Sequence, residues 1–278
     1  MTVQPAIPFG GVAGLRLLDS TFDRQFAAFS QGAVLTRETD DFVARAGSIT
    51  SAEALVEDRQ LLKVALGAFG LEDELPKRAL IRRVLEEGTV AQDSLANRLV
   101  DPAWRRFAEA MGFGDFGGRL DRESVRQEIV ENYRVRQFER AVGDADVDLR
   151  LALNFRREIG TIASGENADR FGWFQVIGSE PLRIVAFGAL GLPESLGAID
   201  LDNQVQRISA RAEQVFGSSS PALFVEEANV EEAVERFLFR AQAAAGPSVT
   251  SPGVTALTLL QTSPLGPSST AGLFASRL

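Results

Sequence analysis

The sequence contains one stretch twice, and this repetition restricts the folds open to the chain more than its composition does. Residues 61–75 read LLKVALGAFGLEDEL and residues 182–196 read LRIVAFGALGLPESL, with eight of the fifteen positions identical at a constant spacing of 121 residues. In each copy an apolar run ends in a Gly-Leu pair, which is typical of a helix closed by glycine in the left-handed conformation. The repetition therefore predicts a helical protein built from two similar halves.

Apolar residues elsewhere in the chain follow helical spacing, and no alternating strand pattern with turn signals interrupts them. Two long apolar stripes, over about 122–142 and 144–162, predict long helices that form an antiparallel hairpin or a bent rod. A glycine-rich turn at 112–118 precedes them. We therefore predict an all-α fold. Its predicted parts are a flexible leader (1–12), an N-terminal helical half (13–118) and a C-terminal helical half (119–245).

Residues 246–278 differ in composition from the rest of the chain. They are rich in Ser, Thr, Pro and Gly, and Arg277 is their one charged side chain, which predicts a flexible tail. The tail contains two apolar islands, VTALTLL at 254–260 and GLF at 272–274. It is either a plain linker or a segment that becomes ordered on a partner surface. In the second case the predicted contact residues are Val254, Leu257, Leu259, Leu260, Leu273 and Phe274.

The composition excludes several kinds of site and partner. The chain has no Cys and no His, which rules out disulfides, thiolate nucleophiles, Cys/His zinc sites and a histidine general base. Its net charge of −9 argues against nucleic acid or an anionic membrane as the main partner. No window approaches the roughly 18 to 20 apolar residues that a membrane span requires. The first residues lack the basic region of a cleaved secretory signal.

Two motifs match the sequence patterns of binding sites but lack the other features that such sites require. The glycines of 112–117 spell G-x-G-x-x-G, but they follow a predicted helix, whereas a dinucleotide site needs a preceding strand. The aspartates of 144–148 alternate as at the start of a calcium loop, yet the twelfth position is Phe155 and not Glu. The glycine motif is better explained as a loop, and the aspartates are better explained as charges at a helix N-terminus. We therefore predict no catalytic, cofactor-binding or metal-binding residue, and a protein that is not an enzyme.

Several segments together resemble the bacterial family of domain of unknown function 1217 (DUF1217), whose members often lie in flagellar gene neighbourhoods. The resemblance covers most of residues 10–242 and leaves out the tail. It implies a helical protein linked to the flagellum, and it carries over no catalytic residue. The segments that carry it include GGVAGLRLLDSTFDRQFAAF (10–29), the two repeat copies with their flanks (61–88 and 166–205), NRLVDPAWRRFAEAMGFGDFGG (97–118) and VENYRVRQFERAVGDADVDLRLALNFRREI (130–159).

Three functions remain open at this point. The first is a non-enzymatic structural or assembly protein of the flagellum that acts through protein–protein contacts, and the second is a cytoplasmic export chaperone or scaffold for flagellar proteins. The third is a small-ligand-binding protein or enzyme with a pocket between the halves, bordered by Trp104, Tyr133 and Trp173. For these aromatic residues we favour core packing. The sequence leaves open the oligomeric state and whether the protein stays in the cytoplasm or is exported to the flagellum.

Overall fold

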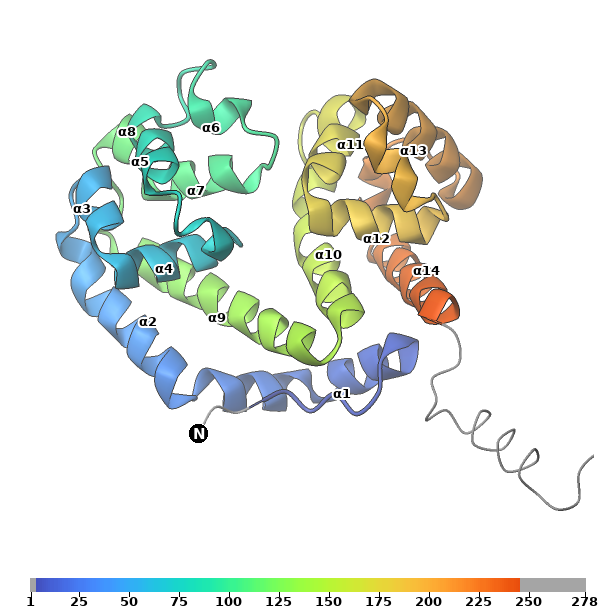
Figure 1. Cartoon of the computed structure of the whole chain (residues 1–278), viewed down its shortest axis with the longest axis horizontal. Helices are drawn as coiled ribbons and strands as arrows, with labels where there is room; N and C mark the ends of the chain where they lie inside the picture. Colours follow the sequence, from blue (N-terminus) through green and yellow to red (C-terminus); the bar gives the residue numbers. More distant parts are fainter. Residues whose placement is uncertain (1–3, 246–278) are drawn as a thin grey trace, which may run out of the picture.

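The computed structural model describes residues 4–245, and within them helices are joined by short loops and no β-strand occurs (Figure 1). The all-α prediction is confirmed. The predicted contact residues of the tail, Val254, Leu257, Leu259, Leu260, Leu273 and Phe274, lie outside the described residues.

The helices follow one another in two groups. The first comprises α1 (Gly11–Ser30), α2 (Ala33–Arg45), α3 (Ala52–Glu57), α4 (Arg59–Gly67), α5 (Arg78–Glu87), α6 (Leu95–Arg98), α7 (Ala103–Met111) and α8 (Phe113–Phe116). The second comprises α9 (Glu123–Ala145), α10 (Val147–Ala163), α11 (Ala168–Gly178), α12 (Glu180–Leu190), α13 (Leu201–Phe216) and α14 (Glu227–Ala245). Short 3-10 turns are η1 (Ala46–Ser48), η2 (Glu72–Glu74), η3 (Glu194–Ala198) and η4 (Pro221–Val225).

The long helices α9 and α10 meet at Asp146 and diverge from it as the two arms of a V (Figure 1). Asp146 adopts an extended backbone conformation, and its carboxylate accepts a hydrogen bond from the amide of Leu149 at 3.0 Å. This is an N-cap, which satisfies an amide that has no partner within the helix. The alternating aspartates of 144–148 thus include the residue that starts α10, as the helix-terminus interpretation predicted.

Two clusters of buried side chains form the core. One contains Phe42, Phe107 and Tyr133, and the other contains Phe138 and Phe155. Helix α9 is continuous and packs against both clusters. Tyr133 on this helix belongs to the first cluster and Phe138 to the second, so the boundary between the clusters lies between these two residues. This boundary therefore lies C-terminal to the division at residue 118 that the sequence suggested.

The three aromatic residues that could have bordered a pocket are core residues. Trp104 and Tyr133 belong to the first cluster, Trp173 to the second, and each is at most 5% exposed. The indole of Trp173 donates to the carbonyl of Ser219 at 2.7 Å, so its one polar group is satisfied. The burial of all three side chains confirms core packing, and Trp104 also borders a cleft of about 510 Å³.

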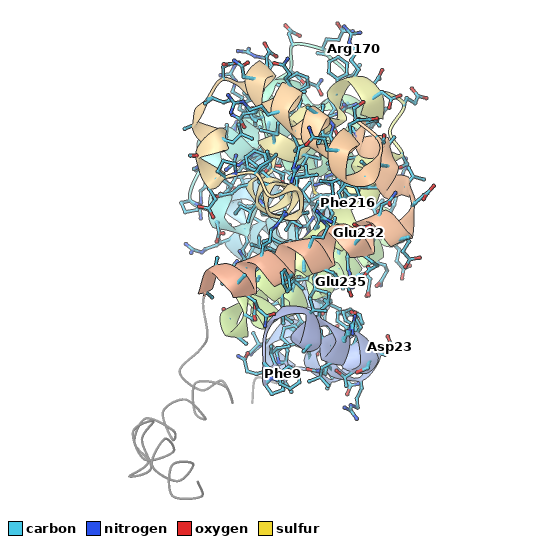
Figure 2. The ribbon with its side chains drawn as sticks, turned by 90° about the vertical axis from the view of Figure 1, so that its right-hand side faces the viewer. Phe9, Asp23, Arg170, Phe216, Glu232 and Glu235 are labelled. Atoms are coloured by element: carbon cyan, nitrogen blue, oxygen red, sulfur yellow. The ribbon has the colours of Figure 1, made fainter. Side chains whose placement is uncertain are left out.

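Helix α1 joins the two groups. It packs against α9, α10 and α14, and Figure 2 shows α14 lying beside it with Glu235 on the facing side. Arg16 of α1 binds Glu235 at 3.1 Å. Phe29, near the end of α1, packs against both core clusters. The first helix in the sequence therefore packs across helices of the second group, and through Phe29 it also reaches the first core cluster.

Both repeat copies end in the same way. Gly70 and Gly191 have φ angles of +79° and +68°, which a residue with a Cβ rarely adopts. The amide of Leu71 donates to the carbonyl of Leu66, and that of Leu192 to Phe187, each at 2.9 Å. This hydrogen bond, from the amide after the glycine to a carbonyl five residues earlier, is typical of a Schellman motif. The helix end that the repetition predicts is present in both copies.

Each copy also meets a long helix at a glycine. A Cβ at Gly67 would lie 2.6 Å from the ring of Tyr133 on α9, and a Cβ at Gly188 would lie 2.6 Å from the ring of Phe237 on α14. Glycine is the only residue that permits this approach. The contact between a repeat glycine and an aromatic ring of a long helix therefore occurs twice, once at Gly67 with Tyr133 and once at Gly188 with Phe237.

An arginine one turn further along the long helix completes the contact. Arg136 donates to the carbonyl of Ala68 at 2.8 Å, and Arg240 donates to that of Ala189 at 2.9 Å. Both carbonyls lie at the C-terminal end of a repeat helix, where no amide of the helix can satisfy them. The same local arrangement thus recurs in both halves, whereas the similarity of the complete halves stays a prediction.

Candidate functional site

The described residues contain two buried carboxylates, and they lie next to each other. Glu158 on α10 and Glu139 on α9 each have a side chain that is 8% exposed. A glutamate is almost never buried unless it is paired. The partners of these two residues therefore define the first place to look for a site.

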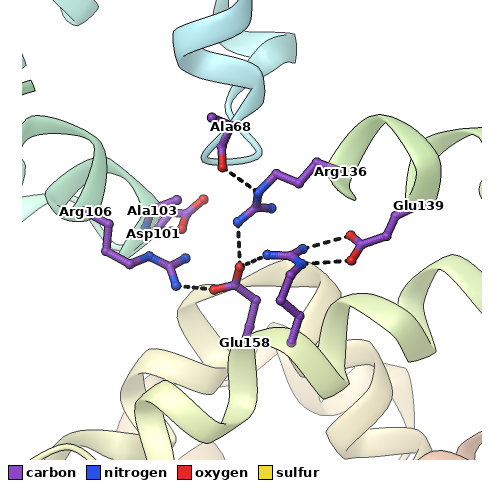
Figure 3. Close-up of polar contacts among 8 residues, drawn as sticks. Ala68, Asp101, Ala103, Arg106, Arg136, Glu139 and Glu158 are labelled. Carbon is purple, nitrogen blue, oxygen red and sulfur yellow. Dashed lines mark hydrogen bonds and ion pairs between the residues drawn. The ribbon is translucent and has the colours of Figure 1, made fainter. Parts of the chain in front are cut away.

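Three arginines surround the carboxylate of Glu158, as Figure 3 shows. Arg106 comes from α7, Arg136 from α9 and Arg157 from α10 itself. Arg136 Nη2 lies 2.5 Å from Glu158 Oε1, and Arg106 donates to the other oxygen, Oε2. One carboxylate thus holds arginines from three helices.

The contacts continue on both sides of Glu158. Arg157 binds Glu139 with two hydrogen bonds of 2.8 Å, and this bidentate geometry is the strongest that an arginine and a carboxylate form. Arg136 uses its Nε for the carbonyl of Ala68 at the end of α4. We call Arg106, Arg136, Glu139, Arg157 and Glu158 the Glu158 cluster; it ties α4, α7, α9 and α10 together.

The charges of the cluster determine the protonation of its members. Burial raises the pKa of Glu158, but the positive charges of Arg136, Arg106 and Arg157 outweigh it and hold that pKa below its ordinary value. Burial and the neighbouring Arg157 lower the pKa of Arg136 to about 10, which still leaves it protonated at pH 7. Glu158 and Arg136 are therefore both ionised at neutral pH.

A third carboxylate, that of Asp101, lies at the edge of the cluster. Burial raises its pKa above the ordinary value. It accepts a hydrogen bond from the amide of Ala103 at 2.8 Å, in the first turn of α7 (Figure 3). Its geometry is that of a helix cap, which accounts for a partly buried aspartate at this position.

Two adjoining clefts open beside the Glu158 cluster, one of about 470 Å³ and one of about 630 Å³. Both are lined by Arg106, Glu109 and Thr161. The smaller is also lined by Arg119, whose Nη1 donates to the carbonyl of Glu109 at 3.2 Å. The clefts offer positively charged groups from α7 and the loop before α9, which suits an anionic group.

The glycine motif at 112–117 is not part of these clefts. Gly112 and Gly117 have left-handed conformations on either side of the short helix α8, as expected for a loop. Asp115 between them accepts hydrogen bonds from the amides of Thr89 and Val90, which hold its pKa low despite burial. The motif fastens α8 to the end of α5. Among residues 4–245 no group of three acidic residues is placed to hold a metal ion.

Sequence reasoning missed the Glu158 cluster. The usable signal was Glu158 itself, because it follows Phe155 by three positions and so lies near the apolar stripe of its helix. Its partner Arg106 is 52 residues away in the sequence. No local pattern connects the two.

Comparison with known proteins places the chain in a family. A family model described as "Protein of unknown function (DUF1217)" matches residues 68–222, which include the complete Glu158 cluster. A crystal structure of protein AGR_C_984 from Agrobacterium tumefaciens is similar in fold, with a TM-score of 0.71 and 24% identity. The similarity covers 88% of this chain and 100% of that one. A search of curated proteins gives no match.

No helix among the described residues has the length and apolar character needed to cross a bilayer. The family match extends over more than half of the chain, and the resemblance seen in the sequence is thereby confirmed. The chain belongs to the DUF1217 family of proteins of unknown function.

Proposed function

We propose that this protein is a non-catalytic structural or assembly component of the bacterial flagellum that acts through protein–protein contacts. The observation that carries the non-catalytic part is the saturation of the Glu158 carboxylate by arginines. Both oxygens of Glu158 accept hydrogen bonds from arginines, and its pKa lies below the ordinary value. A general acid or base instead needs a pKa near the working pH and a free position for the substrate.

The cluster has the properties of a brace between helices. Its ion pairs connect α7 and α10, and the bond from Arg136 to Ala68 adds α4. A brace of this kind keeps outer surfaces in a fixed relation, as a protein that binds other proteins requires. The flagellar part of the proposal rests on the gene neighbourhoods that the family resemblance implies.

Two measurements test the proposal in a bacterium that carries the gene. Cells that produce an epitope-tagged protein are separated into cytoplasm, culture supernatant and purified hook–basal bodies, and each fraction is probed. We expect the protein in the purified organelle, and a strain without the gene should lose swimming. Normal swimming with normal filaments, hooks and motors would refute the proposal. Lost swimming with the protein found in the cytoplasm alone would favour the export chaperone.

One observation favours a second function, that of a small-ligand-binding protein. The cleft of about 470 Å³ presents Arg106 and Arg119 from two different elements, and ligands with a carboxylate or phosphate would fit such a pair. The test is a thermal-shift screen of anionic metabolites against the native protein and Arg119→Ala. A compound that raises the melting temperature of the native protein alone would support this function. Equal responses of both proteins would count against it.

A further inference from the structure

A groove of about 690 Å³ lies between α12 and α14, next to the end of the described chain. Its floor contains Phe187 and Phe237, which are almost fully buried, and Ile184, Leu192 and Ala241 add further apolar surface. Ala244, the penultimate described residue, also lines it. Ala244 belongs to the last turn of α14, which ends at the lower right in Figure 1, so the chain leaves the described structure next to this groove.

A counterpart, a cleft of about 510 Å³, lies beside α4 and α9, and residues of α10, α11 and α12 also line it. The glycine pairs that line the two clefts are related by the repeat spacing, Gly67 and Gly70 in the first half and Gly188 and Gly191 in the second. The long helices correspond as well, because Arg136 and Arg240 occupy the same place in both. The two clefts are therefore equivalent positions of the recurring helix contact.

The chain that follows the long helix forms part of the wall of the first of these clefts. After α9 the chain turns at Asp146, and the next helix contributes Arg150, Leu151 and Asn154 to the wall. In the second half the chain that follows α14 is residues 246–278. Among residues 4–245, Asp148 of α10 and Gly197 and Ala198 of η3 border the second groove, and none of them follows α14 in the chain.

The lining of the second groove is more apolar than that of the first cleft, although five charged residues also border it: Asp148, Glu180, Arg183, Glu194 and Arg240. Three polar residues that line the first cleft, Glu72, Gln137 and Arg140, have as counterparts Pro193, Ala241 and Ala244. The segment VTALTLL at 254–260 is uncharged and mostly apolar. Its Ala256 and Leu257 are also identical to Ala152 and Leu153 of α10 at the spacing that relates Arg136 to Arg240.

The length of chain permits this contact within one molecule. Eight residues lie between Ala245 and Val254, and the nine residue-to-residue steps of an extended chain span about 30 Å. A short tether also raises the effective concentration of a segment at its site to the millimolar range. A second copy of the protein has no such advantage at ordinary concentrations.

We propose that residues 254–260 bind in the groove between α12 and α14 of the same molecule, with Leu257 and Leu259 over Phe187 and Phe237. In this arrangement the segment lines the groove as residues of α10 line the first cleft. A partner that uses the groove has to displace the segment. The inference goes beyond the proposed function and does not depend on it.

Cysteine cross-linking of the full-length protein tests the contact, since the chain has no Cys of its own. One variant combines Ala241→Cys in the groove with Thr258→Cys in the segment. Its matched control combines Thr258→Cys with Ala243→Cys, an exposed position on the same helix that does not line the groove. The tethers are nearly equal, so a segment without a binding site would cross-link to both at equal rates.

We expect the groove pair to form the intramolecular disulfide about tenfold faster than the control pair, independently of protein concentration. Adding Leu257→Asp and Leu259→Asp to the groove pair should remove this advantage. Circular dichroism of each variant verifies that the helices remain folded. Equal rates for the two pairs would overturn the inference. Disulfides formed only between molecules would also overturn it and would assign the groove to a second copy.

Discussion

Replacing Glu158 tests how much one buried carboxylate stabilises the fold. Glu158→Gln removes the negative charge and leaves Arg106, Arg136 and Arg157 close together without it. Removal of one partner from a buried ion pair costs about 3–5 kcal/mol, because the remaining charges stay buried. We expect the free energy of unfolding, measured by urea denaturation at pH 7, to fall by about 3 kcal/mol.

Glu128→Gln is the matched control. Glu128 is exposed on α9, so the same chemical change should alter the free energy of unfolding by less than about 0.5 kcal/mol. Similar losses in both variants would show that the cluster stabilises the fold no more than a surface charge does.

The same residue predicts a dependence on pH. The pKa of Glu158 is lower in the folded protein than its ordinary value of 4.5. The folded state therefore binds this proton less readily, and the stability that Glu158 contributes is present above pH 4.5 and is lost as the pH falls through the folded pKa. The difference in unfolding free energy between the native protein and Glu158→Gln should be constant from pH 7 to 5.5 and should shrink below 4.5. A difference that stays constant at acid pH would contradict this.

The two repeated glycines carry the next prediction, at the scale of the helix pair. Gly67→Ala or Gly188→Ala would place a methyl group against a ring that packing holds in position, Tyr133 or Phe237. Overpacking of this kind costs about 1–3 kcal/mol, and we expect each variant to unfold at lower urea concentration. Gly160→Ala on α10 is the control, because a Cβ there meets nothing within 4 Å. It should stabilise the protein by about 0.5–1 kcal/mol through helix propensity. Destabilisation of all three alike would contradict the close-packing argument.

For single helices, the sequence predicts features that depend on adjacent residues. The helix ends at Gly70 and Gly191 follow from a few adjacent residues, and both are observed. The capping of these ends by Arg136 and Arg240 could not be predicted, because the arginines are many residues away from the carbonyls that they bind. The Glu158 cluster escaped prediction for the same reason, since its contacts are set by the packing of whole helices.

For the whole molecule, periodic apolar residues were enough to predict an all-α fold, because each helix needs only one buried face. They did not predict that α1 would return across the second group of helices. Phe22, Phe26 and Phe29 lie on the expected stripe, and all three rings meet Phe138, which lies more than a hundred positions further along the chain. Helical spacing shows which face is buried and does not show against which partner.

This use of α1 predicts that the two core clusters unfold together. Phe29 packs against both, and Arg156 of α10 binds Asp19 of α1 at 2.8 Å and also Glu231 of α14. Since α9 runs through both clusters as well, neither can lose its helices without exposing part of the other. We expect a single calorimetric transition whose calorimetric and van't Hoff enthalpies agree, although the protein is larger than most two-state domains. Phe29→Ala should lower the temperature of that one transition. Two resolved transitions in the native protein would mean that α1 and α9 do not couple the clusters, and the halves would then be independent domains.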